Sequence, residues 1–321
     1  MPKKPKKSAS TKSAPKADAP KASELSEPTE VIEPSEAAAA EPDATMPFSV
    51  ALRWRPDAQL ADIDPRSTPG FTGDKKAGQV LLAESAPEIG ELQERLYAQA
   101  RGGSKARLLL VVQGMDTSGK GGIMRHVVGL MDPQGVDITA FKAPNAVERN
   151  HPFLWRIRQA LPKPGQVGVF DRSQYEDVLI VRVHNLVPSS TWSRRYGQIN
   201  TFEASCAKEG ITMIKVMLHI SKKEQGERLG ARLDNPEKYW KYNPGDIDER
   251  ELWDDYQVAY QAVLDKTSTD VAPWYVVPAD RKWYARLAVQ QLVLEHLQLM
   301  DPQWPAADFN VEVEKKRLAA S

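Results

Sequence analysis

Cysteine is nearly absent from this sequence, since Cys206 is the only one among 321 residues. A single cysteine excludes an intramolecular disulfide and leaves a cysteine-based metal site without enough ligands. A free cysteine usually behaves as a small apolar residue. We therefore expect Cys206 to be buried and structural.

Long apolar runs and an excess of one charge are also missing. No stretch approaches the about 18 apolar residues that span a bilayer, and no apolar segment follows the N-terminal lysines as in a secretory signal. Lys plus Arg and Asp plus Glu each number 43, so the formal net charge is zero. No overall field favours nucleic acid or a membrane, and any basic site must be local. We expect a cytoplasmic protein with no membrane partner.

Histidine ligands for a metal are lacking as well. No pair among the five histidines has metal-ligand spacing, so we expect structural or surface positions for His126, His151, His184, His219 and His296. His184 follows the third predicted strand closely, which leaves a position facing the cleft as the alternative.

Residues 1–45 contain almost no large apolar side chains. Seven lysines lie between positions 3 and 21, and six glutamates and an aspartate lie between positions 24 and 43. Such a segment cannot bury enough apolar surface to offset its ordering entropy, so we predict a disordered charged tail. A solvated tail whose halves partly neutralise each other is the favoured interpretation. Binding of nucleic acid or another polyanion by the basic half is the alternative.

Apolar segments alternate with helix-like segments in the rest of the chain. The spacing of apolar residues predicts strands over 107–113, 136–142, 166–170, 211–219 and 274–277. It predicts helices over 75–100, 119–131, 151–160, 174–183, 190–209, 221–233, 248–265 and 280–300. This alternation predicts an α/β fold with a parallel sheet covered by helices on both faces. We assign residues 46–104 to an N-terminal arm and helix packed on the core, 105–300 to the core, and 301–321 to a weakly structured tail.

The stretch from Leu108 to Gly122 organises this core. An apolar run ends in Gly-Met-Asp-Thr-Ser-Gly-Lys and leads into a helix, which is the order that builds a phosphate cradle. The expected phosphate-binding residues of the loop are Gly114, Thr117, Ser118, Gly119, Gly121 and Gly122, with Lys120 as its positive charge. Gly121 stands where Ser or Thr usually holds magnesium. If a metal is used, Asp116 inside the loop is the first candidate ligand.

The third predicted strand ends in a second group of polar residues. Ligands of parallel sheets bind at the C-terminal ends of the strands, and this strand ends at Asp171, which Arg172 and Glu176 follow. A carboxylate beside a phosphate loop suits magnesium, so Asp116 and Asp171 are predicted to share the ion. The alternative for Asp171 is an N-cap. Arg172 can bind a phosphate through two N–H groups or pair with an acidic neighbour. Glu176 can contact the metal, orient the acceptor or have a structural role.

A basic helix and a loop rich in proline and tryptophan span residues 222–247. Arg228 and Arg232 are four residues apart and therefore share one helix face. A mobile lid that brings positive charge over the phosphates and excludes water would suit phosphoryl transfer. A solvated charged helix is the alternative.

Several of these segments together resemble the polyphosphate kinase 2 family. The resemblance covers about residues 50–300 and rests on GMDTSGKGG at 114–122, DRSQYEDVL at 171–179, RVH at 182–184, RLDNPEKYWK at 232–241 and WYVVPADRKW at 274–283. It implies a P-loop kinase fold that transfers phosphoryl groups between inorganic polyphosphate and nucleotides with Mg²⁺ or Mn²⁺.

The resemblance also implies roles for single residues. Asp116 and Asp171 match the paired metal-binding or catalytic aspartates, and Lys120 matches the loop lysine. The implied phosphate ligands are Arg172, Arg182, Arg228 and Arg232. Glu176 marks the subgroup that accepts nucleoside mono- and diphosphates, although members of that subgroup often carry Asn where this chain has Asp171. The family commonly forms dimers or tetramers, so we expect a homo-oligomer.

Three other functions are kept beside this one. An ATP-dependent nucleotide kinase could use the same fold. The lysine-rich tail could make the protein a binder of nucleic acid or another polyanion. A catalytically inactive P-loop scaffold is the third alternative.

Overall fold

The computed structural model describes residues 46–321, and its centre is a five-stranded parallel sheet in the order β2-β3-β1-β4-β5. The predicted disordered tail lies outside the described residues. The strands are β1 (Arg107–Gly114), β2 (Val136–Ala140), β3 (Val167–Asp171), β4 (Ile211–His219) and β5 (Trp274–Pro278). All the predicted strands are present within two residues of their expected ends, which confirms the α/β fold.

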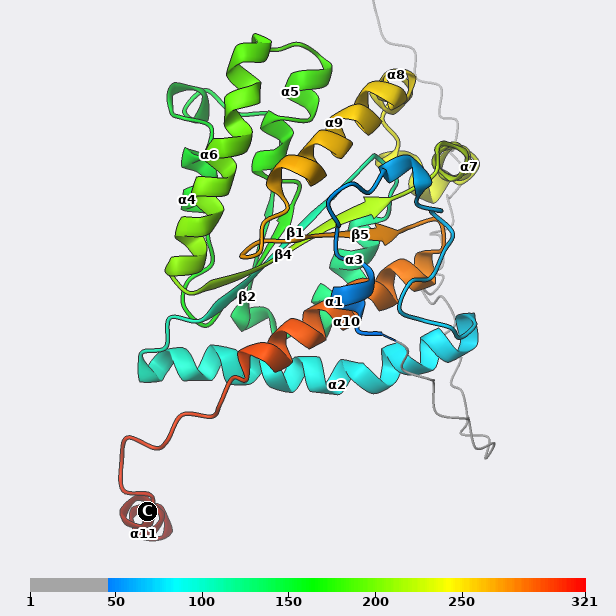
Figure 1. The fold of residues 1–321 in the computed structure, drawn as a ribbon. Coiled ribbons are helices and arrows are strands. Elements are labelled where there is room, and N and C mark those ends of the chain that lie inside the picture. The colour runs from blue at the N-terminus through cyan, green and yellow to red at the C-terminus, as the bar shows by residue number, and fades with distance from the viewer. Residues whose placement is uncertain (1–45) are drawn as a thin grey trace, which may run out of the picture. The chain divides into compact units, whose positions relative to one another are not determined.

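Helices cover both faces of this sheet. Consecutive side chains of β1 point to opposite faces, and both sets are apolar, so each face packs against a layer of helices. Leu108, Leu110 and Val112 pack in one core cluster with residues of α2 and α10. Leu109 and Val111 pack in a second cluster with residues of α6 and α9. Figure 1 shows α2 and α10 below the sheet, and α6 and α9 above it. The long helices are α2 (Lys75–Gln99), α6 (Ser189–Lys208), α9 (Trp253–Thr267) and α10 (Lys282–Met300).

The remaining helices are shorter. They are α1 (Phe48–Ala51), α3 (Lys120–His126), α4 (Trp155–Gln159), α5 (Ile180–Val183), α7 (Lys222–Leu233), α8 (Gly245–Glu251) and α11 (Val311–Ala319). Two 3₁₀ segments also matter here: η6 (Gln174–Asp177) and η7 (Pro236–Lys241).

The N-terminal residues 46–104 pack against the last helix of the core. Backbone N–H groups of Phe48 and Ser49 donate to the Glu295 carboxylate on α10, at 2.7 and 2.8 Å. Helix α2 begins at Asp74, whose side chain accepts from the N–H of Ala77. None of the helices within residues 46–321 is long and apolar enough to cross a membrane.

Several helix predictions differ from the structure. The predicted helix 248–265 is two helices, α8 and α9, and the predicted helix 151–160 is α-helical only over Trp155–Gln159. The predicted helix 174–183 is divided, because Leu179 adopts φ −101° and ψ −90°, outside the helical region. The predicted helix 119–131 leaves the α conformation after His126 and continues as a 3₁₀ turn at Val128–Leu130. The C-terminal residues 301–321 are more structured than expected. Asn310 caps α11 and Arg317 pairs with Glu314 there, although none of the residues of α11 is buried.

Candidate active site

The phosphate loop requires glycine at both ends. Gly114 ends β1 with φ +150°, and a Cβ atom there would lie 2.6 Å from Ser118 Oγ and 2.8 Å from the Leu218 carbonyl oxygen. Gly119 precedes α3 with φ +116°. Both conformations are unfavourable for residues with a Cβ. A Cβ at Gly121, in contrast, would meet no atom of the described chain within 4 Å, so steric crowding does not explain the missing Ser or Thr.

The loop lysine is folded onto its own loop. Lys120 Nζ donates to the carbonyl oxygens of Gly114 at 2.7 Å and Met115 at 3.3 Å. Burial lowers the pKa of Lys120, and the carboxylates of Asp116 and Asp171 oppose that shift. The lysine thus lies at the loop and shares its electrostatic environment with both predicted metal ligands.

Sheet pairing brings the second predicted carboxylate beside the loop. Asp171 ends β3 in register with Val112 of β1, two residues before Gly114. The backbone N–H of Arg172 donates to the Val112 carbonyl at 3.1 Å, which holds this strand end against β1. Arg172 itself has φ +63° and Thr117 has φ +62°, left-handed conformations that are costly for non-glycine residues and concentrate at functional sites.

Oxygen atoms at this edge fit a hard divalent cation. Within the described residues, Asp171 Oδ1, Thr117 Oγ1 and Ser118 Oγ are buried and have no hydrogen-bond partner. Buried polar atoms are rarely left unpaired, and oxygen is the ligand that Mg²⁺ prefers. Residues 46–321 contain no cluster of three or more His, Cys, Asp or Glu suited to a metal. Magnesium beside phosphates needs only one or two protein carboxylates, so Asp116 and Asp171 remain a suitable pair.

Arg172 and Asp116 join the two motifs directly. Arg172 Nη2 lies 3.1 Å from Asp116 Oδ1, and both side chains remain partly exposed. Glu176 lies near them, and burial raises the pKa of its carboxyl while Arg172 and Lys120 oppose that shift. Turned with its nitrogen toward Glu176, the Gln113 amide donates to Glu176 Oε1 at 3.1 Å.

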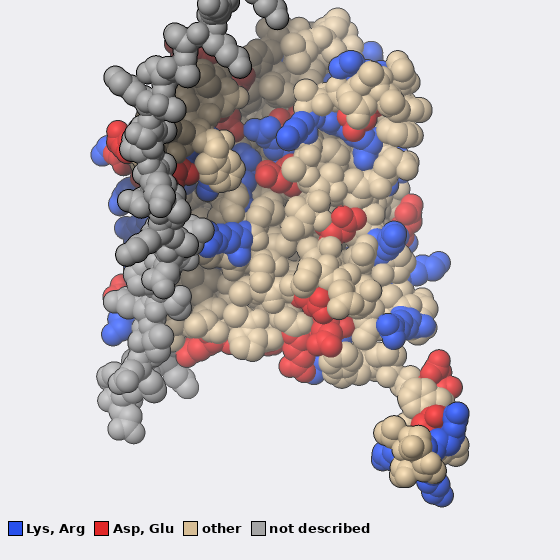
Figure 2. Space-filling model, turned by 180° about the vertical axis from the view of Figure 1, so that it is seen from behind, with Lys and Arg blue, Asp and Glu red and all other residues tan. Residues whose placement is uncertain are grey.

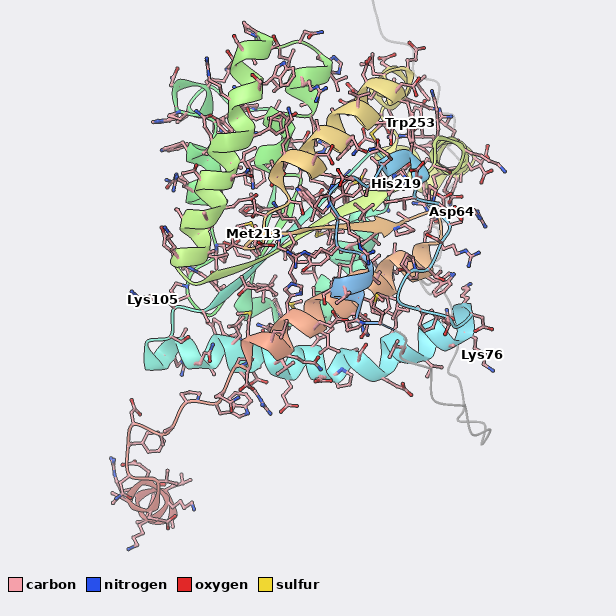
Figure 3. All side chains as sticks on the ribbon, in the orientation of Figure 1. Asp64, Lys76, Lys105, Met213, His219 and Trp253 are labelled. Atoms are coloured by element: carbon pink, nitrogen blue, oxygen red, sulfur yellow. The ribbon has the colours of Figure 1, made fainter. Side chains whose placement is uncertain are left out.

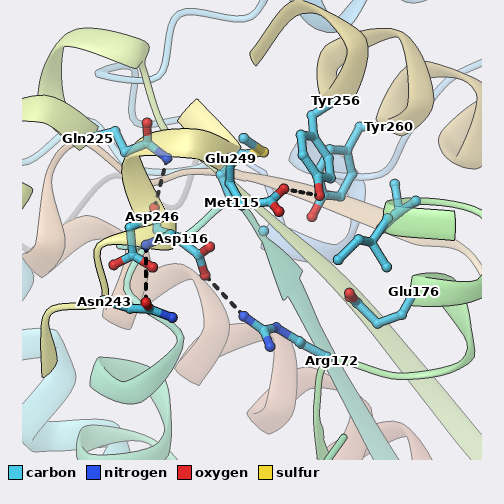
Figure 4. A pocket seen from close by; sticks show the side chains of 14 residues that line it. Met115, Asp116, Arg172, Glu176, Gln225, Asn243, Asp246, Glu249, Tyr256 and Tyr260 are labelled. Atoms are coloured by element: carbon cyan, nitrogen blue, oxygen red, sulfur yellow. Dashed lines mark hydrogen bonds and ion pairs between the residues drawn. The ribbon is translucent and has the colours of Figure 1, made fainter. Parts of the chain in front are cut away.

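A cavity of about 240 Å³ opens beside this group. Figure 4 shows Asp116 beside Asn243 and Asp246, with Arg172 below them and with Glu176 on the side of Tyr256 and Tyr260. The residues that sequence reasoning missed here are Asp246, Glu249, Tyr256 and Tyr260. Asp246 lies inside the predicted lid segment 222–247 and Glu249 lies two residues beyond it, both on α8, and that position was the signal available. His184 Nε2 lies 2.9 Å from Glu249 Oε1, so the histidine contacts a residue that lines the cavity.

Arg228 occupies a different position from the one expected. Its guanidinium is buried, and its N–H groups point to the carbonyl oxygens of Thr117, Ser118, Ala279 and Asp280 and to the Glu224 carboxylate. A guanidinium has five N–H donors, and these five contacts engage them. Arg228 therefore ties the phosphate loop to the segment after β5, and a direct contact of Arg228 with the phosphates stays a prediction.

Arg232 and Arg182, unlike Arg228, contact parts of the protein other than the phosphate loop. Arg232 Nη1 donates to the Lys241 carbonyl at 2.9 Å and lies 3.3 Å from Asp246 Oδ2, so it holds α8 to the lid. The Arg182 guanidinium carbon lies 4.8 Å from the centre of the Trp192 ring. Arg182 lines a separate cavity along α9, together with His219 and Trp253, which Figure 3 labels. The structure thus does not bring Arg182 together with the predicted phosphate ligands.

Two cations of α10, Lys282 and Arg286, belong to a group of charges near the phosphate loop. Burial lowers the pKa of Lys282, and Arg228, Lys238 and Arg286 lower it further. A Cβ at Gly122 of the loop would lie 3.8 Å from Arg286 Nε. Figure 2 shows Lys and Arg side chains around a hollow on the face opposite to the view of Figure 1. Sequence reasoning missed Lys282 and Arg286, because α10 is more than 150 residues from the loop.

Cys206 is buried, as expected, and burial raises the pKa of its thiol to about 12. It lies in the core cluster with α6 and α9.

The chain is similar to proteins of one family over most of its length. The family model for polyphosphate kinase 2 (PPK2) matches residues 72–305. AMP/ADP-polyphosphate phosphotransferase of Meiothermus ruber is 44% identical over 255 residues, which cover 79% of this chain and 94% of that protein. ADP-polyphosphate phosphotransferase of Rhodopseudomonas palustris is 41% identical over 253 residues, covering 75% and 86%. The crystal structure of polyphosphate kinase 2 from Arthrobacter aurescens TC1 matches with a TM-score of 0.85 and 54% identity, covering 89% of this chain and 100% of that one.

Proposed function

The chain belongs to the polyphosphate kinase 2 family, and we propose that it transfers phosphoryl groups between inorganic polyphosphate and AMP or ADP, or the corresponding guanine nucleotides. The single observation that carries this proposal is the arrangement at the phosphate loop. A cavity lined by Asp116, Arg172 and Glu176 opens beside the loop. Arg286 of α10 lies near Gly122 of the loop, and Lys282 is close enough to Arg286 for their charges to interact. A linear polyanion suits these cations, and a nucleotide acceptor suits the cavity.

The names of the relatives support the acceptor class. The M. ruber protein is named for AMP and ADP, and the R. palustris protein for ADP. A Pseudomonas syringae protein that is 37% identical over 219 residues is named a polyphosphate:AMP phosphotransferase. Glu176, the predicted marker of acceptance of both mono- and diphosphates, lines the cavity.

The residues of the chain contribute mainly charge and position. Phosphoryl transfer needs no covalent nucleophile, and its transition state spreads negative charge over the transferred group. In this proposal Lys120 and Arg172 stabilise that charge, backbone N–H groups of the loop bind the phosphate, and Glu176 orients the acceptor. Asp116 and Asp171 would hold Mg²⁺ or Mn²⁺, and the bound ion would supply positive charge that neutralises the phosphates.

A nucleotide panel tests the proposal. Purified protein is supplied with AMP, ADP, GMP or GDP and either polyphosphate or ATP as sole donor, and products are separated by chromatography. We expect di- and triphosphates to form with polyphosphate, and the Lys120→Met variant to lose this activity. Transfer from ATP alone would overturn the proposal and favour an ATP-dependent nucleotide kinase. Absence of turnover with either donor, in the parent and in the Lys120→Met variant alike, would favour an inactive scaffold.

Other expectations stay predictions. We expect a cytoplasmic location and a homo-oligomer, either a dimer or a tetramer. Binding of nucleic acid by residues 1–45 is another, and deletion of these residues tests it: loss of a DNA mobility shift with phosphotransfer intact would assign that binding to the segment.

A further inference from the structure

A fully buried ion pair lies beneath the segment that carries Arg172 and Glu176. Lys215 on β4 and Glu203 on α6 both have side chains that are 0% exposed, and Lys215 Nζ lies 2.7 Å from Glu203 Oε2. Neither residue lines the cavity at the phosphate loop. The pair therefore has no direct access to a substrate in that cavity.

The pair holds two residues of η6. Lys215 Nζ donates to Tyr175 Oη at 2.8 Å, and Tyr175 Oη donates to Glu203 Oε1 at 2.6 Å. Gln174 Nε2 also donates to Glu203 Oε1, at 3.0 Å. The third ammonium donor goes to the Thr267 carbonyl at 2.7 Å. An ammonium has three donors, so Lys215 is saturated, and two of its three partners are tied to η6.

Stability alone is a weak reason for such a pair. Removing two charges from water costs several kcal/mol per ion, and apolar residues of similar volume often stabilise a core equally well. What a buried ion pair adds is a defined geometry for the groups bound to it. Here those groups are Gln174 and Tyr175, which lie between Arg172 and Glu176 along the chain.

This location matters because the chain before η6 is strained. Arg172 has φ +63°, a conformation that persists only when its surroundings enforce it. On its N-terminal side the Arg172 N–H is bonded to Val112. On its C-terminal side Ser173 caps η6, and Gln174 and Tyr175 are held by Glu203. Releasing Tyr175 would release one of the two sides that enforce this conformation.

We propose that Glu203 and Lys215 are positioning residues that act through Tyr175 to hold Arg172 and Glu176 in the reactive arrangement. The inference rests on the proposed function, because it assumes that Arg172 and Glu176 serve the transfer. Misplacement of reacting groups by about 1 Å can cost about a hundredfold in rate. A mobile η6 would therefore reduce turnover even with every residue of the cavity unchanged.

Tyr175→Phe is the sharpest test, because it removes only the hydroxyl. The ring stays packed on Trp274, with centroids 4.7 Å apart, and the Lys215–Glu203 pair is intact. Tyr275→Phe is the matched control. Tyr275 is also buried, its hydroxyl bonds His296 Nε2 at 3.1 Å, and it packs in the cluster on the other face of the sheet. Both variants and Glu203→Gln are assayed for kcat, for KM of both substrates and for Tm.

We expect Tyr175→Phe to lower kcat about tenfold or more with both KM values within about threefold of the parent, while Tyr275→Phe leaves kcat within about twofold. In a double-mutant cycle, Arg172→Lys should cost less in the Tyr175→Phe background than in the parent, because the two changes disturb one unit. Equal kcat in the two Tyr→Phe variants, or strict additivity with Arg172→Lys, would overturn the inference. The proposed function is tested separately, by the activity of the parent with polyphosphate. The positioning role is tested by the ratio of kcat between variant and parent, which can be measured with whichever donor the parent uses.

Discussion

Arg172 Nη2 and Asp116 Oδ1 lie 3.1 Å apart and link the end of β3 to the phosphate loop. The two residues are 56 positions apart in the chain, and parallel pairing of β1 with β3 brings them together. The ion pair keeps a cation beside a predicted metal ligand. It also leaves the remaining guanidinium N–H groups available for a phosphate.

Arg172→Lys should lower kcat/KM for phosphoryl transfer by about a hundredfold, because an ammonium cannot pair with Asp116 and fork onto a phosphate in the same geometry. The free energy of unfolding should change by less than about 1 kcal/mol, since both partners are partly exposed. Steady-state kinetics and thermal unfolding check this. Arg53→Lys is the control, because Arg53 also pairs with an aspartate, Asp270, at 2.9 Å, away from the loop. Equal loss of activity in both variants would contradict a specific role of Arg172.

Asp171→Asn should raise the Mg²⁺ concentration needed for half-maximal activity without lowering Tm in metal-free buffer. Asp171 Oδ1 is buried and has no partner within the described residues, so removing the charge does not break a hydrogen bond of that atom. Titrations of activity with MgCl₂ and unfolding scans in a chelator give the two readouts. An unchanged Mg²⁺ dependence would exclude Asp171 as a ligand.

Arg228→Lys should destabilise the protein by about 2 kcal/mol and lower activity with every acceptor alike. Lysine offers three donors where arginine uses five, so at least two of the five acceptors, four carbonyl groups and the Glu224 carboxylate, lose a charged partner. Arg232→Lys, one helical turn later and more exposed, should cost much less. Denaturant unfolding of the two variants measures this difference in stability. A higher KM for polyphosphate in Arg228→Lys with unchanged stability would instead support the direct phosphate contact expected from the sequence.

Acid should destabilise the fold partly through His296. Burial lowers the pKa of this imidazole, although the Leu292 carbonyl and Glu295 oppose the shift. A histidine whose folded pKa is lowered contributes stability that is present above its usual pKa of 6.5 and is lost as the pH falls toward the folded value. Its Nε2 atom also lies 3.1 Å from Tyr275 Oη. We therefore expect His296→Gln to flatten the fall in Tm between pH 7.5 and pH 5.5. A parallel fall in parent and variant would assign the acid sensitivity to other groups.

The sequence was sufficient for features whose physical cause is local. The strands of residues 107–113 and 211–219 were predictable from continuous apolar runs, because parallel strands are buried on both faces. The phosphate loop was predictable because Gly114, Gly119 and Lys120 form a motif of fixed spacing. The break at Leu179 was not, since an apolar residue at that position fits the helix period whether or not its backbone is helical.

Arg228 and Arg232 mark the limit of that reasoning. They share a helix face and a charge, so spacing predicts the same role for both, yet one is buried with its guanidinium on backbone carbonyls and the other binds α8. Only the docking of α7 against the phosphate loop distinguishes them. The position of Arg182 also depends on tertiary structure, because its side chain packs on Trp192 and not on the phosphate loop.

By itself, the sequence determined the phosphate loop, the carboxylate at the end of the third strand and the family, because these depend on residue types at fixed short spacings. The tertiary structure decided which distant side chains complete the site: Asp246, Glu249, Tyr256 and Tyr260 around the cavity, Lys282 and Arg286 beyond the loop, and the Lys215–Glu203 pair beneath η6. The physical reason is that these contacts form between elements far apart in the chain. Their geometry comes from how helices pack on the sheet, which no local pattern of residues specifies.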